Sequence, residues 1–402
     1  MSPVIVFQPR DSWRDDLLTH GKPPIPTACH ANYKTILTGC PLFVGKFRFN
    51  TLSAEVDVVG ELPWDRPTHA KTWNDQDDIE LTCWLNKLGI RARPRDASEA
   101  MLLAAHANSY NPLQDYLNGL DWHGHDYVGD WLTYYLKVGR CTYSMETGRT
   151  WLVSAVARAL NPGCQVDCCI VLEGEQGTYK SSALRILGGE YFTDAPTSNL
   201  NSKDSMMLCR GAWIVELSEL ESLSRTTLGA TKAFLSRRED RYRPPYGTHP
   251  QTFRRACVFA GTTNSDEYLI DPTGARRFLP VKCGLINKEA LERDRDQLWA
   301  QAVAIYKSSD NQWWLDKSMN KIVSAEQAKR FTQHPWLGPI TEYIGKRNEI
   351  TVEAILTHCL KIERGQWKRD VQMDVVNCLK ALKFNPAMVK KRRIYRRSHL
   401  SY

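Results

Sequence analysis

The sequence lacks any long apolar segment. No run of about 18 or more apolar residues occurs in the 402-residue chain, and its N-terminus shows no apolar signal segment. An internal repeat and a low-complexity tract are absent as well. These absences exclude a protein with helical membrane spans and a repeat solenoid, and they predict that the chain has no membrane partner.

The cysteines lack the density of a disulfide framework. Twelve cysteines in a chain of this length favour small buried side chains over paired ones, and they predict a reducing, intracellular compartment. Thirteen tryptophans, by contrast, are many, and they favour a folded chain over a disordered one. The length suffices for two or three domains with sizeable cores.

Acidic residues are absent from one stretch near the C-terminus. The whole chain has 53 Lys and Arg against 45 Asp and Glu, a net charge of +8, which is compatible with nucleic acid as a partner. Residues 380–397 contain eight cations and no acid. A helix is predicted before them at 370–382 and a basic strand at 388–395, an order typical of a winged-helix-like DNA binder. The alternative is a solvated basic tail. The candidate DNA-binding residues here are Lys390, Lys391, Arg392, Arg393, Arg396 and Arg397.

The most informative segment is 171–182, with the sequence VLEGEQGTYKSS. A predicted apolar strand leads into a loop with two glycines, and the loop ends in Lys-Ser where a helix is predicted at 182–187. This arrangement is typical of a phosphate-binding loop, in which backbone N–H groups at a helix N-terminus bind the phosphates of ATP. Lys180 would reach the β- and γ-phosphates as a catalytic residue, and Ser181 would hold Mg²⁺. The candidate nucleotide-binding residues are Gly174, Gln176, Gly177, Thr178, Tyr179, Lys180, Ser181 and Ser182.

The loop departs from the usual pattern G-x-x-x-x-G-K-[ST] at one position. Tyr179 stands directly before Lys180, where the pattern has glycine. A residue with a side chain must avoid strained backbone angles at that turn. The alternative interpretation is an ordinary strand–turn–helix with a surface Lys-Ser pair.

Strand-like runs alternate with helices after this loop, which predicts an α/β fold with a mostly parallel sheet. The predicted strands are 169–172, 212–217, 256–260 and 277–282.

Three further groups follow in the order that a nucleotide-hydrolysing site needs. Glu216 and Glu219 come at the end of an apolar strand, where either could hold Mg²⁺ or orient the attacking water, and the sequence does not separate their roles. Asn264 follows the next strand and is placed to hydrogen-bond the γ-phosphate or the water. Arg276 and Arg277 precede the last strand and suit an arginine finger for a neighbouring subunit's nucleotide. The alternatives are a turn-forming asparagine and a local salt bridge.

Arginines interleave with aromatic residues between the acids and the asparagine. Such a pattern favours a track for single-stranded nucleic acid, on a loop or hairpin near Pro244 and Gly247. The alternatives are a solvated loop and arginines that serve the nucleotide. The residues of the track are Arg237, Arg238, Arg241, Tyr242, Arg243, Tyr246, Phe253, Arg254 and Arg255.

Taken together, these motifs resemble the virulence-associated protein E family, the phage- and island-borne replication proteins related to superfamily 3 helicases. Several separate segments carry the resemblance, strongly over about 110–315. They are 173–182, 213–220, 232–235, 240–246, 261–264 and 271–278.

The resemblance implies a hexamer-forming helicase core of the AAA+ type, with ATP and Mg²⁺ bound between subunits. It implies the roles given above for the phosphate loop, the acids, Asn264 and the paired arginines. Lys232 matches the lysine of an intervening motif that lies near DNA or nucleotide in such helicases. The implied partners are single-stranded and origin DNA, further copies of the chain and a separate primase, in the cytoplasm of a bacterial host cell. We expect no primer synthesis, because 1–110 leaves no room for a full primase domain.

We therefore predict an AAA+-type P-loop NTPase core of the α/β class, with a mostly helical N-terminal domain and a small winged-helix-like C-terminal module. The predicted domains are 1–110, of unknown role, 111–330 and 331–402. In the N-terminal domain a helix is predicted at 74–88, and the acids of its first turn are expected to form a solvated cap.

The predicted activity is ATP-dependent translocation and unwinding of DNA by a ring. One alternative is a nucleotide-dependent DNA-binding or loading factor that does not unwind, with Tyr179 impairing hydrolysis. A small-molecule kinase is disfavoured, because it needs neither the arginine track nor the basic tail.

Overall fold

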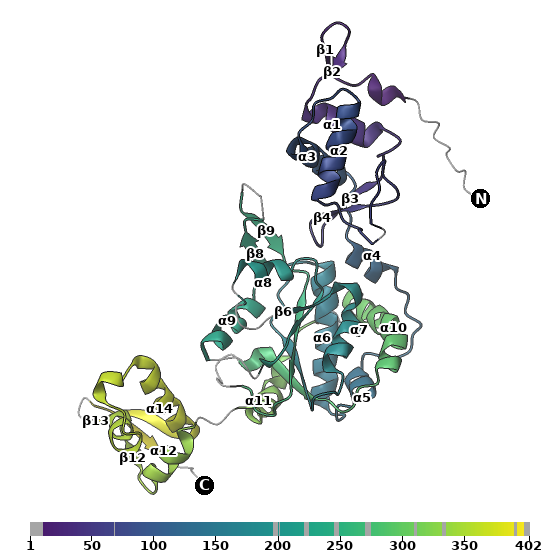
Figure 1. Ribbon diagram of the computed structural model, residues 1–402. Helices are drawn as coiled ribbons and strands as arrows, with labels where there is room; N and C mark the ends of the chain where they lie inside the picture. The colour runs from purple at the N-terminus through teal and green to yellow at the C-terminus, as the bar shows by residue number, and fades with distance from the viewer. Residues whose placement is uncertain are drawn as a thin grey trace. The chain divides into compact units, whose positions relative to one another are not determined.

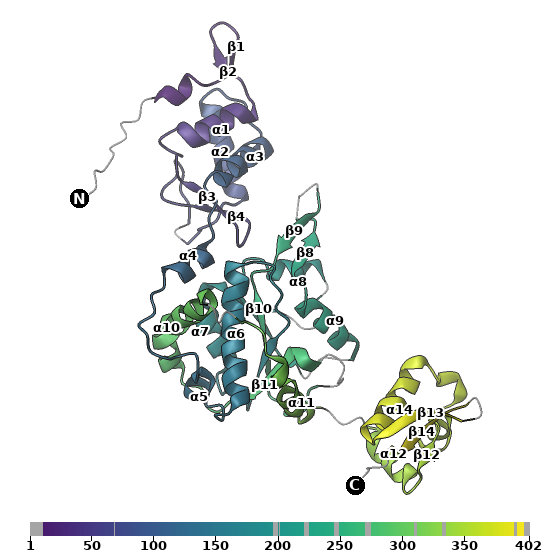
Figure 2. The same cartoon turned by 180° about the vertical axis from the view of Figure 1, so that it is seen from behind.

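The computed structural model describes residues 11–67, 69–195, 200, 202–220, 225–244, 249–269, 275–308, 312–331, 335–389 and 392–397. The chain divides into two compact units. The first consists of 1–265 and 276–323, and the second of 266–275 and 324–402. Figures 1 and 2 show the elements of both units from opposite sides.

The N-terminal part of the first unit has a hydrophobic core of its own. Helices α1, α2 and α3 enclose this core, and two short antiparallel strand pairs, β1–β2 and β3–β4, accompany them. Tyr33, Ile36, Leu81, Leu85 and Met101 are among its buried side chains. The elements are η1 (Asp11–Arg14), β1 (Thr19–His20), β2 (Ile25–Pro26), α1 (His30–Gly39), β3 (Phe47–Asn50), β4 (Glu55–Val58), α2 (Asp75–Lys87) and α3 (Pro94–His106).

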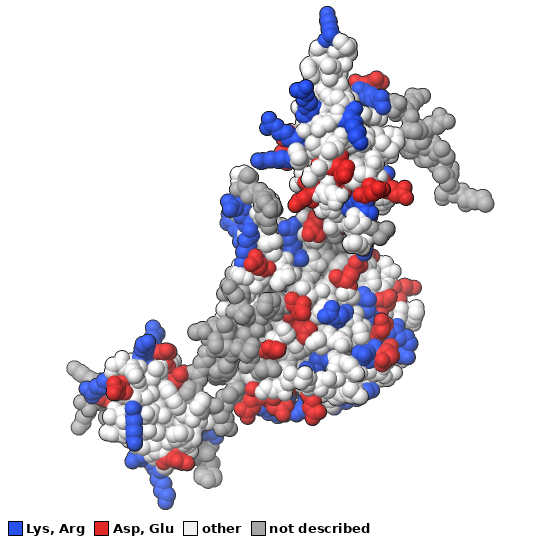
Figure 3. Space-filling model, viewed as in Figure 1, with Lys and Arg blue, Asp and Glu red and all other residues white. Residues whose placement is uncertain are grey.

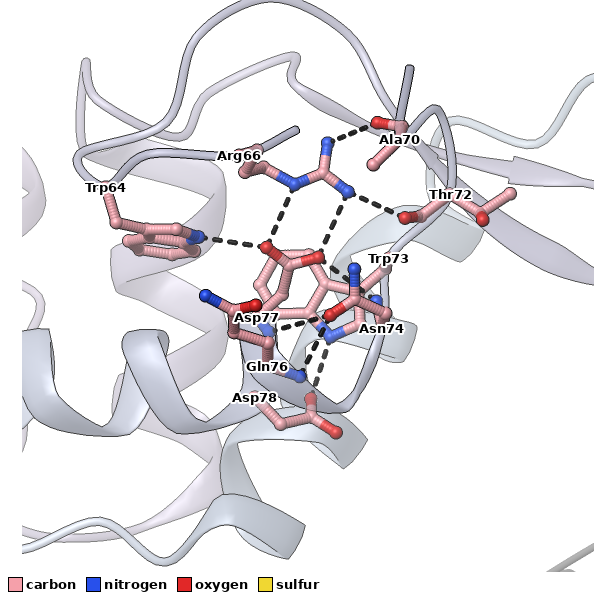
Figure 4. A network of polar contacts seen from close by, with 9 residues as sticks. All are labelled: Trp64, Arg66, Ala70, Thr72, Trp73, Asn74, Gln76, Asp77 and Asp78. Carbon is pink, nitrogen blue, oxygen red and sulfur yellow. Dashed lines mark hydrogen bonds and ion pairs between the residues drawn. The ribbon is translucent and has the colours of Figure 1, made fainter. Parts of the chain in front are cut away.

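The N-terminus of α2 differs from the expected solvated cap in one respect. Asn74 and Asp77 form a capping box, but Asp77 is buried and pairs with Arg66 at 2.9 Å. Trp64 Nε1 donates to the same carboxylate at 2.9 Å (Figure 4). Because Arg66 and Trp64 come from the segment before the helix, this carboxylate ties that segment to α2. The other acids of the turn, Asp75 and Asp78, are not part of this ion pair.

The larger part of the first unit is a five-stranded parallel sheet between helices. The strand order is β11-β5-β10-β7-β6, and all four pairings are parallel. Its elements are α4 (Pro112–Gly119), α5 (Trp131–Leu136), α6 (Thr142–Leu160), β5 (Cys169–Glu173), α7 (Lys180–Gly188), η2 (Gly189–Tyr191), β6 (Phe192–Ala195), α8 (Lys203–Leu208), β7 (Ile214–Leu217), α9 (Arg225–Leu235), β8 (Glu239–Tyr242), β9 (Gln251–Arg254), β10 (Val258–Thr263), η5 (Ala275–Arg277), β11 (Phe278–Lys282), α10 (Lys288–Lys307) and η6 (Lys317–Met319).

Both faces of this sheet are covered, which explains why its strands are continuous apolar runs. Helices α6, α7 and α10 pack on one face, and α9 lies on the other (Figures 1 and 2). Tryptophan indoles join the layers on the first face. Trp213 Nε1 donates to Ala155 O of α6 at 2.9 Å, and Trp299 Nε1 donates to Leu187 O of α7 at 3.0 Å. The carboxyl ends of β5, β7 and β10 therefore meet at one rigid edge.

The four predicted strands of the sheet are confirmed, at 169–173, 214–217, 258–263 and 278–282. The sequence did not indicate β6, the fifth strand. The predicted hairpin near Pro244 is also confirmed as the antiparallel pair β8–β9.

The larger segment of the second unit starts within α11 (Asn320–Ala328), and this unit has a third hydrophobic core. Its elements are α12 (Leu337–Ile344), β12 (Glu349–Ile350), α13 (Val352–Ala354), η7 (Ile355–Cys359), η8 (Arg364–Gln366), α14 (Arg369–Ala381), β13 (Phe384–Val389) and β14 (Arg392–Arg397). The three strands form an antiparallel sheet in the order β12-β14-β13. The predicted helix at 370–382 is confirmed, but the single strand predicted at 388–395 was wrong. That segment contains the end of β13 and the start of β14, so the chain turns where one strand was expected.

Candidate functional site

The loop between β5 and α7 lies at the carboxyl edge of the sheet. Gly174 has φ +153°, and a Cβ there would stand 3.1 Å from Cys283 O. Gly177 has φ +85°. Both glycines are thus required by the backbone, since L residues rarely adopt these angles and a side chain at Gly174 would also collide.

Tyr179 adopts the left-handed conformation that the usual glycine would supply. Its φ and ψ are +68° and +28°, a genuine outlier for a bulky side chain. The expectation that a non-glycine residue would avoid such angles is therefore wrong. Tyr179 therefore takes a backbone conformation that favours glycine.

Lys180 is held within the loop by oxygen atoms. Its ammonium donates to Gly174 O at 2.7 Å, to Glu175 O at 2.8 Å and to Asn264 Oδ1 at 3.0 Å. Thr178 Oγ1 lies 3.3 Å away. The side chain is only 7% exposed. The contact with Asn264 brings together two residues that lie far apart in the sequence, one on the loop and one after β10.

Ser181 and Glu216 form the second contact of the site. Ser181 Oγ donates to Glu216 Oε1 at 2.6 Å, and Thr262 Oγ1 donates to the same oxygen at 2.7 Å. Glu216 is 2% exposed. A hydroxyl and a carboxylate oxygen at this separation are hard donors of the kind that Mg²⁺ prefers. The residues present therefore fit the divalent cation that was predicted for Ser181 with Glu216 or Glu219.

A cavity of about 380 Å³ opens over these groups. The lining residues are Gln176, Gly177, Tyr179, Lys180, Ser181, Ser182, Ser218, Glu219, Thr262, Thr263 and Asn264. Gly174 and Thr178 shape the loop behind it. Glu219 is exposed at the cavity, with the left-handed φ of +55°, whereas Glu216 is buried beside Ser181. The structure thus distinguishes the surroundings of the two acids that the sequence left equivalent.

Sequence reasoning missed three lining residues, Ser218, Thr262 and Thr263. Thr262 and Thr263 directly precede Asn264, so the motif was in view, but only the strand register shows that the Thr262 hydroxyl reaches Glu216. Behind the loop, Cys283 N donates to Glu173 O at 2.8 Å. Burial raises the pKa of the Cys283 thiol to about 12, so it stays protonated and supplies no nucleophile.

Arg276 and Arg277 lie at the amino ends of the parallel strands, whereas Lys180 lies at their carboxyl ends. They precede β11, which runs parallel to β5 with Phe278 opposite Cys169, so the length of β5, roughly 15 Å, separates them from the loop. Arg277 Nε donates to Ser236 Oγ at 2.7 Å, while Arg276 is exposed. Neither arginine is brought to the cavity of its own chain.

The arginine track divides into buried and exposed members. Arg255 is buried and pairs with Asp240 at 2.6 and 2.7 Å, so its assignment to the track was wrong. Tyr242 and Lys232 are also buried, and their side chains do not form part of the surface. Arg237, half-buried, lies over the Phe234 ring.

The exposed members of the track are Arg238, Arg241, Arg243 and Arg254. Figure 3 shows basic side chains gathered along the β8–β9 hairpin. Arg241 lies in β8, Arg243 directly follows β8, and Arg254 lies in β9. The alternation of β8 explains the division, because Asp240 and Tyr242 point inward while Arg241 points outward. Tyr246 lies outside the described residues.

In the second unit, β14 carries the described part of the basic tail. Arg393, Arg396 and Arg397 are exposed. Arg396 pairs with Glu349 at 2.6 Å, and Arg397 lies over the Phe384 ring. Lys390, Lys391 and the side chain of Arg392 lie outside the described residues.

Within the described ranges, no group of three or more His, Cys, Asp or Glu side chains could hold a metal ion. Among the same residues, no helix is both long enough and apolar enough to cross a membrane.

Comparison with known proteins gives a family match across the core. The family model of the virulence-associated protein E-like domain matches residues 117–332. No curated protein sequence matches the chain. Among solved structures, an apo structure of the NrS-1 C-terminal region (305–718) is 11% identical, with 87% of this chain and 95% of that chain covered and a TM-score of 0.45. An A-form apo structure of the same region is 12% identical with the same coverage and TM-score.

Proposed function

Because the chain belongs to the virulence-associated protein E-like family, we propose that it is a replication protein of a phage or another mobile element. Its activity in this proposal is ATP hydrolysis coupled to movement along DNA. The observation that carries the proposal is the convergence of Lys180, Ser181 and Asn264 on one cavity at the carboxyl ends of a parallel sheet, with Glu216 hydrogen-bonded to Ser181. Ligands of open α/β sheets bind at this edge.

The chemistry assigned to each residue follows from its contacts. Lys180 exchanges its carbonyl partners for the β- and γ-phosphates of ATP. Ser181 and Glu216 hold Mg²⁺, which neutralises charge on the phosphate oxygens when it is bound. Asn264 orients the attacking water or the γ-phosphate, and the exposed Glu219 is the candidate to accept the proton from that water.

The proposed assembly is a ring with a nucleotide site between subunits. The placement of Arg276 supports it, because an exposed arginine at the opposite sheet edge cannot serve its own chain's cavity but can serve that of a neighbour in a head-to-tail ring. A guanidinium supplied in this way stabilises the charge of the transition state.

DNA contacts are proposed at two places. In the first unit, Arg241, Arg243 and Arg254 on the exposed hairpin would contact single-stranded DNA. In the second unit, the order helix, strand, helix, helix and basic hairpin supports a winged-helix module that binds duplex DNA at an origin. A separate primase as partner remains part of this proposal.

A DNA-binding loading factor that does not unwind is the second candidate function. The strained Tyr179 favours it, because the residue departs from the glycine of active phosphate loops. In that case nucleotide binding would persist and turnover would be low with or without DNA.

ATP hydrolysis by the wild type and by Lys180→Ala, each with and without single-stranded DNA, tests the proposal. We expect turnover that DNA stimulates and that the substitution abolishes. Nucleotide binding without turnover above the background of the variant, at concentrations that permit assembly, would favour the loading factor instead.

A further inference from the structure

Lys288 contacts the phosphate loop from outside the sequence motif. Its ammonium lies 4.1 Å from the centroid of the Tyr179 ring, within the range of a cation–π interaction. Tyr179 is 44% exposed and lines the cavity. The segment that carries Lys288 is also joined to the loop, since Ile286 N donates to Thr178 O at 3.3 Å.

Helix stability does not explain a cation at this position. Lys288 is the first residue of α10, where the helix dipole disfavours positive charge. Tyr179 is itself the N-cap residue of α7. The pair therefore stands where two helix N-termini approach each other, and both termini favour an anion.

The cavity has a buried floor and an exposed mouth. Lys180 lines the cavity and is buried, Asn264 contacts Lys180 there, and the buried Glu216 lies behind Ser181. The ring of Tyr179 is exposed at the side where α7 begins. Lys288 does not line the cavity itself but contacts Tyr179, which does. A nucleotide with its terminal phosphate at Lys180 would therefore have to extend past Tyr179 for its inner phosphates, those nearer the nucleoside, to reach Lys288.

We propose that Lys288 is a second phosphate-binding cation of the nucleotide site, and that Tyr179 positions its ammonium through the cation–π contact. This inference rests on the proposed nucleotide-binding function. The inference also explains why a strained tyrosine stands at position 179. A glycine would adopt the left-handed backbone without strain, but it has no ring to contact Lys288. The ligand class is a nucleoside diphosphate or triphosphate. Tyr179 and Lys288 act on the inner phosphates, which both kinds of nucleotide contain.

The test measures affinity for ADP and for ATP with Mg²⁺ by calorimetry. Lys288→Met should weaken both nucleotides by about tenfold, the effect of losing one hydrogen bond to a charged group. Tyr179→Leu keeps a side chain in the left-handed turn but removes the ring, so it should weaken binding similarly. Tyr179→Phe should bind as the wild type does. Lys307→Met, at the other end of α10, removes the same charge and should change nothing.

A double-mutant cycle separates positioning from general structural damage. If Tyr179 acts through Lys288, the variant with both Tyr179→Leu and Lys288→Met should bind no more weakly than either single variant. Losses that multiply, or wild-type affinity in Lys288→Met, would overturn the inference while leaving the proposed function intact. Failure of the wild type to bind either nucleotide would overturn the proposed function as well. Melting temperatures confirm that each variant is folded.

Discussion

Glu216 and Glu219 differ in their surroundings, so removal of each carboxylate should have a different effect. Glu216→Gln keeps the oxygen that accepts from Ser181 and Thr262 but loses the charge that a divalent cation needs. We expect ATP hydrolysis to fall at least about 100-fold with little change in melting temperature. Steady-state measurement of ATP hydrolysis tests this. A near wild-type rate would show that Glu216 does not serve as a metal ligand.

Glu219 offers a separate prediction, because its backbone is strained. The left-handed backbone of a non-glycine residue at φ +55° destabilises the folded state by about 1–2 kcal/mol. Glycine removes this strain, but its greater conformational entropy in the unfolded state cancels part of the gain. Glu219→Gly should therefore raise the free energy of unfolding by about 0.5–1 kcal/mol and abolish hydrolysis.

Lys137→Gly is the matched control for that measurement. Lys137 has a similar φ of +57° in the same unit but does not line the cavity. The Lys137→Gly variant should have a higher free energy of unfolding in denaturant, without loss of activity. Equal activity losses in both variants would show that strain relief, and not the carboxylate, changes hydrolysis.

At the scale of single residues, the sequence indicates what depends on order along the chain. Lys180 and Ser181 follow the loop after β5, and Asn264 directly follows β10, so all three lie at the carboxyl ends of neighbouring parallel strands. Contacts across strands could not be predicted. Thr262 reaches Glu216 only through the β7–β10 register, and Lys288 lies far along the chain from Tyr179.

Among the elements, the β8–β9 hairpin depends on a buried ion pair at its base. Arg255 donates two hydrogen bonds to Asp240, and both side chains are almost fully buried. Asp240→Ala would leave the guanidinium buried and uncompensated, at a cost of about 3–5 kcal/mol. Denaturant unfolding measures this loss. Glu239→Ala, on the exposed side of the same strand, should cost little, and equal losses would contradict the role of burial.

The β13–β14 hairpin allows a test of DNA binding by the second unit. Arg393 is exposed, and Arg393→Ala should lower duplex affinity and reduce the salt slope of binding by about one. Arg364→Ala is the control, because Arg364 is an exposed cation of the same unit that already pairs with Glu353 at 2.7 Å. Binding titrations at several salt concentrations distinguish them. Identical slopes for Arg393→Ala and the wild type would exclude this strand from the interface.

The elements also show where pattern-based prediction ends. Apolar runs indicated four of the five strands of the core, β11, β5, β10 and β7, because parallel strands are buried on both faces. The short strand β6 has only four residues and no such run. The basic tail was predicted as one strand, because a run of consecutive cations does not show where a hairpin turns.

For the whole molecule, mixing two inactive variants tests the ring. Lys180→Ala keeps Arg276 intact, and Arg276→Ala keeps Lys180 intact. If each site draws an arginine from its neighbour, about a quarter of the interfaces in a random mixture contain both groups, and hydrolysis should return in part. Coupled-enzyme measurement of the mixture checks this.

The control mixture combines Lys180→Ala with Glu216→Gln. Lys180 lines the cavity and Glu216 contacts its neighbour Ser181 in the same chain, so no interface regains a complete site and no activity should return. Recovery in this control, or its absence in the first mixture despite assembly, would contradict a site shared between subunits.

The support of the phosphate loop has a consequence for synthesis of the chain. β5 pairs with β11, and the base of the loop is joined to Cys283 and Ile286, which the ribosome adds roughly 110 residues after the loop. At about 5–20 residues per second, a nascent chain carries its loop for roughly 5–20 s before that support emerges. The candidate site is therefore completed late in translation, and a chain interrupted before β11 would expose one edge of β5.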